Sequence, residues 1–304
     1  MEPSLIVYPS EVPCARVLVM LHGLGSTILP FSTHLSTCAN RSADTTIVCV
    51  TYGVSFTSFS SLADQLWGVL LLLGLNSNLI VFGYSMGGFL AQVFAKRYKH
   101  AVLGLVLACT GCATHGTLPL TIKGRVFELL TSVYRMDILN SRNSIMPRSW
   151  FLTADEISLM EANGPTIKCP AVERNAQMHA VLLYMNDSRK VSIQEALEPI
   201  KDLPTLILHG NKDSVLSIGG ACAIHGVCTK SKMYIFKNAG HGILMKYRDE
   251  VSNILYGWIN TTLKDHSTSS GDTTAEAAPT PQSQCHYNSN YSFALKTPSG
   301  TAVE

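Results

Sequence analysis

A serine with glycines two positions away on each side is the residue of this chain best suited to covalent chemistry. The segment Gly83-Tyr84-Ser85-Met86-Gly87 lies between an apolar run and a segment of helical periodicity. A strand–turn–helix of this kind holds a serine in a strained turn where it can act as a nucleophile, and the glycines avoid clashes between strand and helix. The pattern also occurs by chance, and a serine before a helix is often only a cap. Its meaning therefore depends on partner residues.

Two later segments supply an acid and a base, each directly after a predicted strand. His209-Gly210-Asn211-Lys212-Asp213 places one carboxylate in a loop, and Asn238-Ala239-Gly240-His241-Gly242 surrounds an imidazole with small residues. We therefore predict Ser85 as nucleophile, His241 as general base and Asp213 as the acid that orients the imidazole. The order serine, acid, histidine differs from the orders used by chymotrypsin and subtilisin.

An oxyanion site is predicted from the turn His22-Gly23-Leu24-Gly25, which follows an apolar run at 16–21. The backbone N–H groups of Leu24 and Met86 are the predicted donors. Met86 starts the helix after Ser85, where aligned peptide dipoles favour negative charge. The alternative is a glycine turn without chemistry.

Other histidines and carboxylates are weaker candidates. The sequence favours structural roles for His22 and His209. Three further histidines lack a glycine-flanked position after a strand, namely His115, His179 and His225. Asp187 and Asp202 are interpreted as solvated charges or helix caps. If Asp213 is not the acid of the triad, Asp202 is the next candidate, followed by Asp187.

The elements that must position these residues alternate along the chain. Short β-branched or leucine-rich runs alternate with helical patterns between 15 and 263, as in a parallel sheet covered on both faces. The predicted parallel strands are 16–21, 46–51, 79–82, 102–109, 205–209 and 232–236, with a short edge strand at 4–8. The predicted helices are 61–75, 86–98 and 249–263.

The alternation stops in the middle of the chain. Amphipathic pieces at 125–135, 153–162 and 175–185 predict a helical lid at 113–200, inserted into a core of 1–112 and 201–264. Its apolar side chains predict a pocket for apolar acyl groups, unless they only seal the lid to the core: Phe127, Leu129, Leu130, Val133, Tyr134, Met178, Val181, Leu182, Tyr184 and Met185. Residues 265–304 are rich in Ser, Thr, Ala and Pro, which predicts a disordered tail.

Composition narrows the function classes. The chain has 304 residues, 46% of them apolar, and a net charge of +2, which predicts a globular protein. No dense basic stripe is present, so nucleic acid is an unexpected partner. The apolar runs fall short of the roughly 20 residues that span a bilayer. The first residues lack a signal-peptide pattern, so a cytoplasmic location is expected.

Cysteines suggest neither a disulfide framework nor a metal centre. Their number, nine, is odd, and they are scattered along the chain. Cys109 and Cys112 form a Cys-x-x-Cys, but no second pair or histidine cluster completes a zinc site. We expect neither a metal nor an organic cofactor.

Taken in order, these segments resemble signatures of the α/β-hydrolase superfamily, particularly its lidded serine esterases, lactonases and lipase-like members. The resemblance covers 15–263 and rests on GYSMGGFLAQ, LGLVLACT, LPTLILHGNKD and NAGHG. It implies the α/β-hydrolase fold with a helical lid. It also implies a small-molecule substrate with a carboxylic ester or related acyl bond, cleaved through an acyl-enzyme.

Two departures point to an alternative. Thr51-Tyr52-Gly53-Val54-Ser55-Phe56 stands where many members carry an Asp-x-Arg-Gly-x-Gly-x-Ser-like segment, and fewer than fifteen residues precede the first clear strand. These features, with Gly-Phe-Leu-Ala-Gln after the serine, also resemble maspardin, a family regarded as binding proteins. A complete serine, acid and histidine set favours the enzyme. Lyase or perhydrolase chemistry on the same scaffold stays open.

Overall fold

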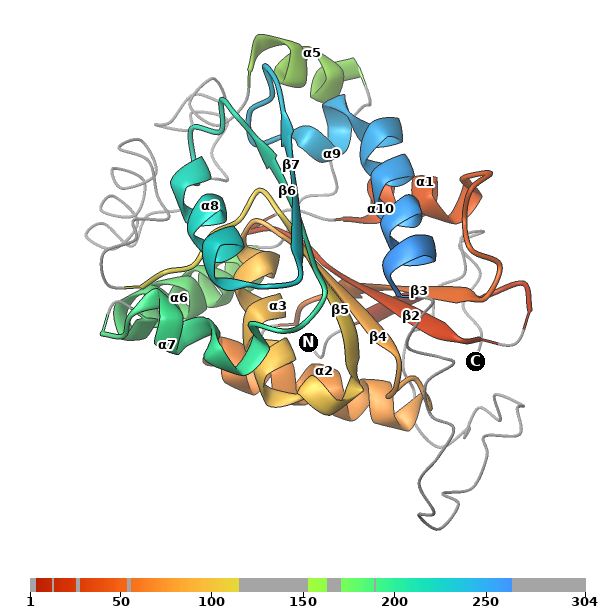
Figure 1. The fold of residues 1–304 in the computed structure, drawn as a ribbon, viewed down its shortest axis with the longest axis horizontal. Helices are drawn as coiled ribbons and strands as arrows, with labels where there is room; N and C mark the ends of the chain where they lie inside the picture. Colours follow the sequence, from red (N-terminus) through yellow and green to blue (C-terminus); the bar gives the residue numbers. More distant parts are fainter. Residues whose placement is uncertain are drawn as a thin grey trace.

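The computed structural model describes residues 4–12, 14–25, 28–53, 56–114, 153–162, 171–188 and 190–263. These contain a seven-stranded sheet of order β1-β3-β2-β4-β5-β6-β7 (Figure 1). The strands are β1 (Ser4–Tyr8), β2 (Arg16–Leu21), β3 (Thr45–Thr51), β4 (Leu79–Tyr84), β5 (Val102–Ala108), β6 (Thr205–Gly210) and β7 (Ser231–Phe236). Strands β2 to β7 are parallel, and β1 is antiparallel to β3. The predicted α/β fold, with six parallel strands and an edge strand, is confirmed.

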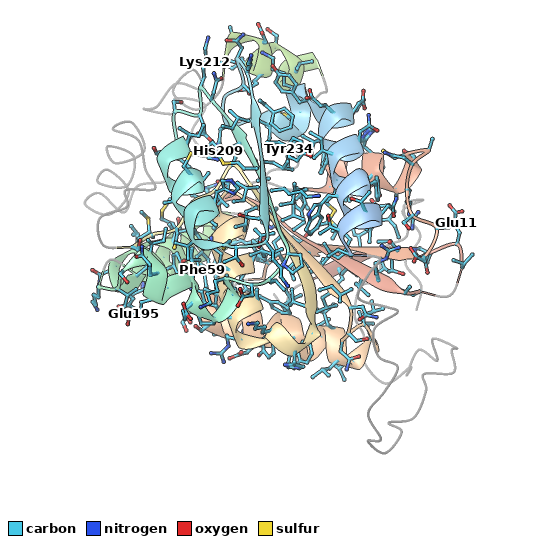
Figure 2. All side chains as sticks on the ribbon, viewed as in Figure 1. Glu11, Phe59, Glu195, His209, Lys212 and Tyr234 are labelled. Carbon is cyan, nitrogen blue, oxygen red and sulfur yellow. The ribbon has the colours of Figure 1, made fainter. Side chains whose placement is uncertain are left out.

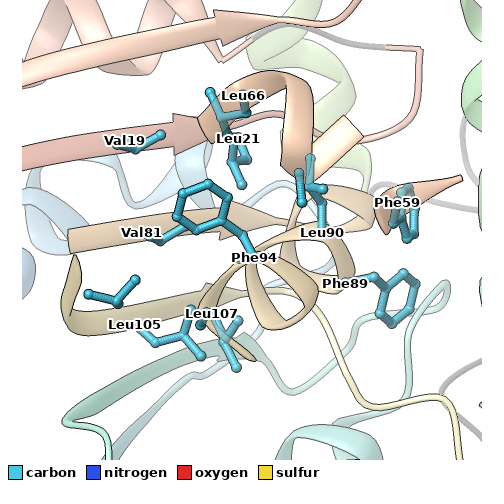
Figure 3. Packing of buried hydrophobic residues seen from close by; sticks show 14 of the residues in the cluster. Val19, Leu21, Phe59, Leu66, Val81, Phe89, Leu90, Phe94, Leu105 and Leu107 are labelled. Carbon is cyan, nitrogen blue, oxygen red and sulfur yellow. The ribbon is translucent and has the colours of Figure 1, made fainter. Parts of the chain in front are cut away.

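Alternating side chains of the strands feed two cores, one on each face of the sheet. Val19 and Leu21 of β2 pack in the cluster under α2 (Phe59–Leu72), α3 (Met86–Arg97) and α8 (Ile218–Val227). Figure 3 shows this cluster, with Phe94 of α3 beside Val81 of β4. Leu18 and Met20 point to the opposite face, under α1 (Leu29–Thr37) and α10 (Arg248–Thr262). The two-residue period of the strands therefore decides which side chains point to each face of the sheet and pack under its helices.

Several element ends differ from the predicted ones for local reasons. Helix α2 begins at Phe59 rather than at 61, because the side chains of Ser58 and Ser61 form a capping box. Strand β5 ends at Ala108 rather than at 109, because Cys109 has a φ of 45°. Helices α1 and α8 were not predicted from the sequence. Helix α1 has no side-chain cap, and α8 contains glycines that disfavour a helix.

The chain between β5 and β6 contains α5 (Ala154–Ala162), α6 (Ala171–Ser188), α7 (Ile193–Leu197) and the 3₁₀ turn Glu198–Ile200. Helix α5 lies beside the short helix α9 (Ile243–Lys246) (Figure 1). On α6, the Tyr184 ring lies 5.4 Å from Phe59 and 5.2 Å from Phe89 between ring centroids. Met185 is buried, and Val181 packs against the core cluster. These side chains of the predicted lid therefore contact the core.

Some predictions fall outside the described residues. They are the helix at 125–135 with its apolar side chains, His115, and the tail at 265–304. Among the helices that the structure describes, none combines the length and the apolar character needed to cross a membrane.

Candidate active site

The structure brings Ser85, His241 and Asp213 together at one edge of the sheet. They follow β4, β7 and β6, whose carboxyl ends meet at that edge because the strands are parallel. Ser85 Oγ lies 2.9 Å from His241 Nε2, and His241 Nδ1 lies 2.7 Å from Asp213 Oδ2. A hydroxyl, an imidazole and a carboxylate thus form one hydrogen-bonded series.

Ser85 sits at a strained turn between β4 and α3. Its φ is 55° and its ψ is −120°, a backbone conformation that costs energy for any residue with a side chain. A Cβ at Gly83 would lie 2.3 Å from the carbonyl oxygen of Gly87, and one at Gly87 would lie 2.3 Å from the carbonyl oxygen of Leu21. Both glycines are therefore required by close backbone approach, as predicted.

The side chain of Asp213 is positioned by its own loop, and His241 keeps it ionised. Its Oδ1 accepts hydrogen bonds from the backbone N–H groups of Val215 at 2.9 Å and Leu216 at 3.0 Å. Burial alone would raise the pKa of Asp213, but the charge and hydrogen bond of His241 outweigh it and lower that pKa. An ionised Asp213 accepts a proton-bearing Nδ1 of His241. The lone pair of His241 Nε2 then faces the Ser85 hydroxyl.

The backbone around His241 is held by residues far away in the sequence. The Tyr84 hydroxyl donates to the carbonyl oxygen of His241 at 2.7 Å. The N–H of Gly240 donates to Glu156 Oε1 at 2.9 Å. Asn238 has a φ of 57°, and its N–H donates to the side-chain oxygen of Asn211 at 2.7 Å.

The predicted oxyanion turn lies against the serine. A Cβ at Gly23 would lie 3.2 Å from Ser85 Cβ, so the turn approaches Ser85 closely. Leu24 follows Gly23 and is half-buried. Met86 is the first residue of α3, and the first N–H groups of a helix have no acceptor within that helix. Met86 thus adjoins Ser85 in the chain, and the turn that contains Leu24 approaches Ser85 at Gly23.

Two groups outside this turn support it. The Tyr52 hydroxyl donates to the carbonyl oxygen of His22 at 3.0 Å, and the two rings stack with centroids 4.0 Å apart. Tyr52 belongs to the segment where the sequence departs from many superfamily members. On the other side, the N–H of Gly25 donates to Oε1 of the buried Gln177 in α6 at 2.8 Å. His22 is buried, as expected for a structural residue.

The weaker histidine and carboxylate candidates that the structure describes differ in burial. His209 is buried at the end of β6 (Figure 2), and its Nε2 lies 3.1 Å from the carbonyl oxygen of Leu216. The remaining four candidates are exposed: His179, Asp187, Asp202 and His225. Asp187 forms a surface ion pair with Lys190, and the side chains of Asp202 and His225 each contact a neighbouring hydroxyl.

The sequence analysis missed the side chains that support the site, which are Tyr52, Tyr84, Glu156 and Gln177, and it also missed Cys109. The Cys109 sulfur lies within 4.8 Å of ligand atoms of Asp213 and His241. Burial, followed by the charge of Asp213, raises the pKa of this thiol. Since Asp213 and His241 already bind each other, we assign this group to the serine site and not to a metal centre. The position of Cys109 directly after a predicted strand was the one sequence feature that could have indicated its place at the site.

Comparisons with known proteins agree with this fold. The family described as alpha/beta hydrolase fold matches residues 16–246. The mouse monoacylglycerol lipase ABHD6 is 24% identical over 59% of this chain and 54% of its own length, so the chain spans about half of that relative. An esterase structure from Thermogutta terrifontis is similar, with a TM-score of 0.65 and 16% identity over 85% of this chain and 93% of that one. The structure of a Paleococcus ferrophilus monoacylglycerol lipase is similar with a TM-score of 0.60 and 16% identity, over 85% of this chain and 98% of that one.

Proposed function

This chain belongs to the α/β-hydrolase fold family, and from that premise we propose that it is a serine hydrolase acting on carboxylic esters through an acyl-enzyme. The observation that carries the proposal is the hydrogen-bonded series of Ser85, His241 and Asp213, with contacts of 2.9 and 2.7 Å. A protein that only binds ligands has no physical need for this series. The maspardin-like alternative therefore becomes an outcome of the test below.

In the proposed acylation step, Ser85 Oγ attacks the carbonyl carbon of the ester. His241 Nε2 takes the hydroxyl proton, and Asp213 stabilises the resulting imidazolium. The backbone N–H groups of Leu24 and Met86 bind the oxyanion of the tetrahedral intermediate. The imidazolium then gives its proton to the departing alcohol, which leaves Ser85 acylated.

In the proposed deacylation step, water attacks the acyl-enzyme. His241 accepts a proton from that water, and the same two N–H groups bind the second oxyanion. Collapse of this intermediate returns the proton to Ser85 and releases the carboxylic acid. The cycle requires neither a metal nor an organic cofactor.

The proposed substrate is a small, largely apolar ester. Two of the similar proteins are named monoacylglycerol lipases, which favours an acylated alcohol over a charged acyl group. The described side chains Val181, Tyr184 and Met185 of the predicted lid contact the core, so the proposal of an apolar acyl site rests on the apolar sequence of that segment. In such a site each substrate methylene contributes about 0.8 kcal/mol of binding. We keep the cytoplasmic location as part of this proposal.

A fluorophosphonate probe on the folded protein, read by mass spectrometry, tests the proposal. We expect an adduct on Ser85 and none on Ser85→Ala. An ester panel, including a monoacylglycerol and neutral esters of increasing acyl length, should then show kcat/KM rising with acyl length. No adduct would favour the binding-protein alternative. A flat acyl-length profile, or preference for a carboxylate-bearing ester, would contradict the apolar site, and turnover without ester hydrolysis would indicate lyase or perhydrolase chemistry.

A further inference from the structure

Glu156 is a buried carboxylate whose two oxygens have different partners. Its side chain is 0% exposed, and it is on the first turn of α5, in the predicted lid. Oε2 accepts the N–H of Thr153 at 2.8 Å, and the N–H of Glu156 points back to Thr153 Oγ1 at 3.4 Å. This reciprocal pair is a capping box and uses one oxygen only. Oε1 is left to bind Gly240, 84 positions away in the sequence, at 2.9 Å.

The Gly240 bond is the contact that ties the backbone next to His241 to the predicted lid. The carbonyl on the other side of His241 is held by Tyr84, which belongs to the core. A buried carboxylate must have its oxygens satisfied, because an unpartnered buried charge is strongly destabilising. The Glu156 carboxylate therefore fixes the Gly240 peptide strongly, since bonds to charged acceptors exceed neutral ones.

The glycines that flank His241 make room for this carboxylate. A Cβ at Gly240 would lie 2.6 Å from Glu156 Oε2, and one at Gly242 would lie 3.0 Å from Glu156 Cδ. The carboxylate thus occupies the space that any larger residue beside His241 would need. Capping of α5 alone does not explain this fit.

The neighbouring residue offers a matched control. Asp155 is on the same turn of α5, and its Oδ2 lies 2.9 Å from Nζ of Lys246 in α9. Its side chain is 72% exposed, so this ion pair contributes little. Two adjacent carboxylates of one helix therefore reach the region of the base, one on the surface and one in the interior.

We propose that Glu156 is a positioning residue that holds His241 in register with Ser85 through the Gly240 N–H. The inference rests on the proposed function and adds a role for the predicted lid within it. Helix α5 then completes the catalytic geometry, in addition to any contact with substrate. Its removal from the core is expected to release the base.

The test compares the full chain with Glu156→Ala, Glu156→Gln, Thr153→Ala and Asp155→Asn, using a p-nitrophenyl ester and the rate of fluorophosphonate labelling. For Glu156→Ala we expect kcat and the labelling rate to fall about 10- to 100-fold, because small displacements of catalytic groups are costly. KM should change by less than about threefold, since substrate contacts are retained. Glu156→Gln keeps one acceptor for two N–H donors and should give an intermediate kcat.

The two controls separate positioning from helix capping. Thr153→Ala weakens the cap but keeps the carboxylate on Gly240, so its melting temperature should fall while kcat stays within about threefold. Asp155→Asn should match wild type. A kcat of folded Glu156→Ala within about threefold of wild type, or an equal loss in Thr153→Ala, would overturn the inference.

Failure of this inference is distinguishable from failure of the proposed function. An unlabelled Ser85 in wild type overturns both, whereas a labelled wild type with an equally reactive Glu156→Ala overturns the positioning role alone. If Glu156→Ala does not fold, Glu156→Gln decides, because it keeps the side-chain volume. A wild-type kcat in Glu156→Gln then refutes the inference, and a kcat lowered at unchanged KM supports it.

Discussion

The acid turn (residues 209–216) and the base turn (residues 238–242) end neighbouring strands but are held in opposite ways. In the acid turn, Asp213 binds the N–H groups of Val215 and Leu216, two and three positions further along. In the base turn, the peptides beside His241 bind Tyr84 and Glu156, from positions far earlier in the chain.

This difference separates what a short motif determines from what the whole fold determines. A carboxylate that binds its own loop takes its place as soon as that loop forms, as in an Asx-type turn. A turn whose supports come from two other elements reaches its geometry only when those elements are packed. The acid and the base therefore differ in how far their positions depend on the rest of the molecule.

Asp213→Asn is expected to cause the largest loss of kcat. It tests the acid turn, which is the turn held by local hydrogen bonds. The amide oxygen still accepts the N–H groups of Val215 and Leu216, so the acid turn should fold. Its NH₂ group, however, disfavours the His241 tautomer that leaves Nε2 free, and kcat should fall about ten-thousand-fold. Steady-state kinetics with a melting curve measure both. A loss below about tenfold would mean that another acid orients His241.

The oxyanion turn (residues 22–25) is held by both local and distant hydrogen bonds, and it should make the free energy of unfolding depend on pH. His22 Nδ1 donates to the adjacent carbonyl oxygen of Gly23 at 2.7 Å, while Gly25 binds the distant Gln177. Burial lowers the pKa of His22 to about 4, only partly offset by its bond to Gly23. Between about pH 6.5 and 4 the unfolded chain therefore binds a proton that the folded chain does not. The free energy of unfolding should fall by about 3 kcal/mol as the pH drops across this range.

Chemical denaturation of wild type and His22→Asn at about pH 7 and about pH 4.5 measures this contribution. The asparagine amide can still donate toward Gly23 but does not titrate, so most of the His22 contribution to the pH dependence should disappear. The exposed His179→Asn controls for histidine replacement. An unchanged pH dependence in His22→Asn would show that His22 takes up its proton without unfolding.

A pair of glycine substitutions sharpens the comparison between the turns. At Gly240 an added Cβ meets the end of the Glu156 side chain, whereas at Gly210, in the acid turn, it meets the Gly240 carbonyl oxygen at 2.3 Å. We expect each Gly→Ala change to lower the free energy of unfolding by about 1–3 kcal/mol. Only the loss at Gly240 should shrink when Glu156→Ala is added. A double-mutant cycle measures this, and equal coupling at both glycines would contradict it.

Much of the fold was predictable because its signals are local. Strands β2 to β7 lie at the expected places, and α2 overlaps the predicted helix at 61–75, although the serine capping box that sets its start at Phe59 was not recognised in the sequence. Helix α1 begins without a side-chain cap and α8 is rich in glycine, so tertiary packing decides both. The φ of Cys109, which ends β5, reflects the packing of the site and carries no sequence signal.

The candidate site was predictable to the same extent. Ser85, Asp213 and His241 each follow a strand within a short motif, and the structure brings all three together. The Thr153-x-x-Glu156 pattern marks a helix start, yet nothing in it names Gly240 as the second partner. Gln177 has no local signal at all. Such contacts need the folded chain, since they join residues more than eighty positions apart.

Tyr84→Phe is expected to have the smallest effect, and it tests whether the remote supports of the base turn act together. The change removes the hydrogen bond to the His241 carbonyl but keeps the ring, whose centroid lies 5.4 Å from that of His241. Burial raises the pKa of Tyr84 well above the usual value for tyrosine, so the hydroxyl keeps its proton and can donate it in a hydrogen bond near neutral pH. Loss of one such bond should cost about 1 kcal/mol of stability and lower kcat about threefold.

If Tyr84 and Glu156 hold one turn jointly, either alone partly suffices, and Tyr84→Phe combined with Glu156→Ala should lower kcat by more than the product of the single losses. Purely multiplicative losses would show that the two bonds support His241 independently.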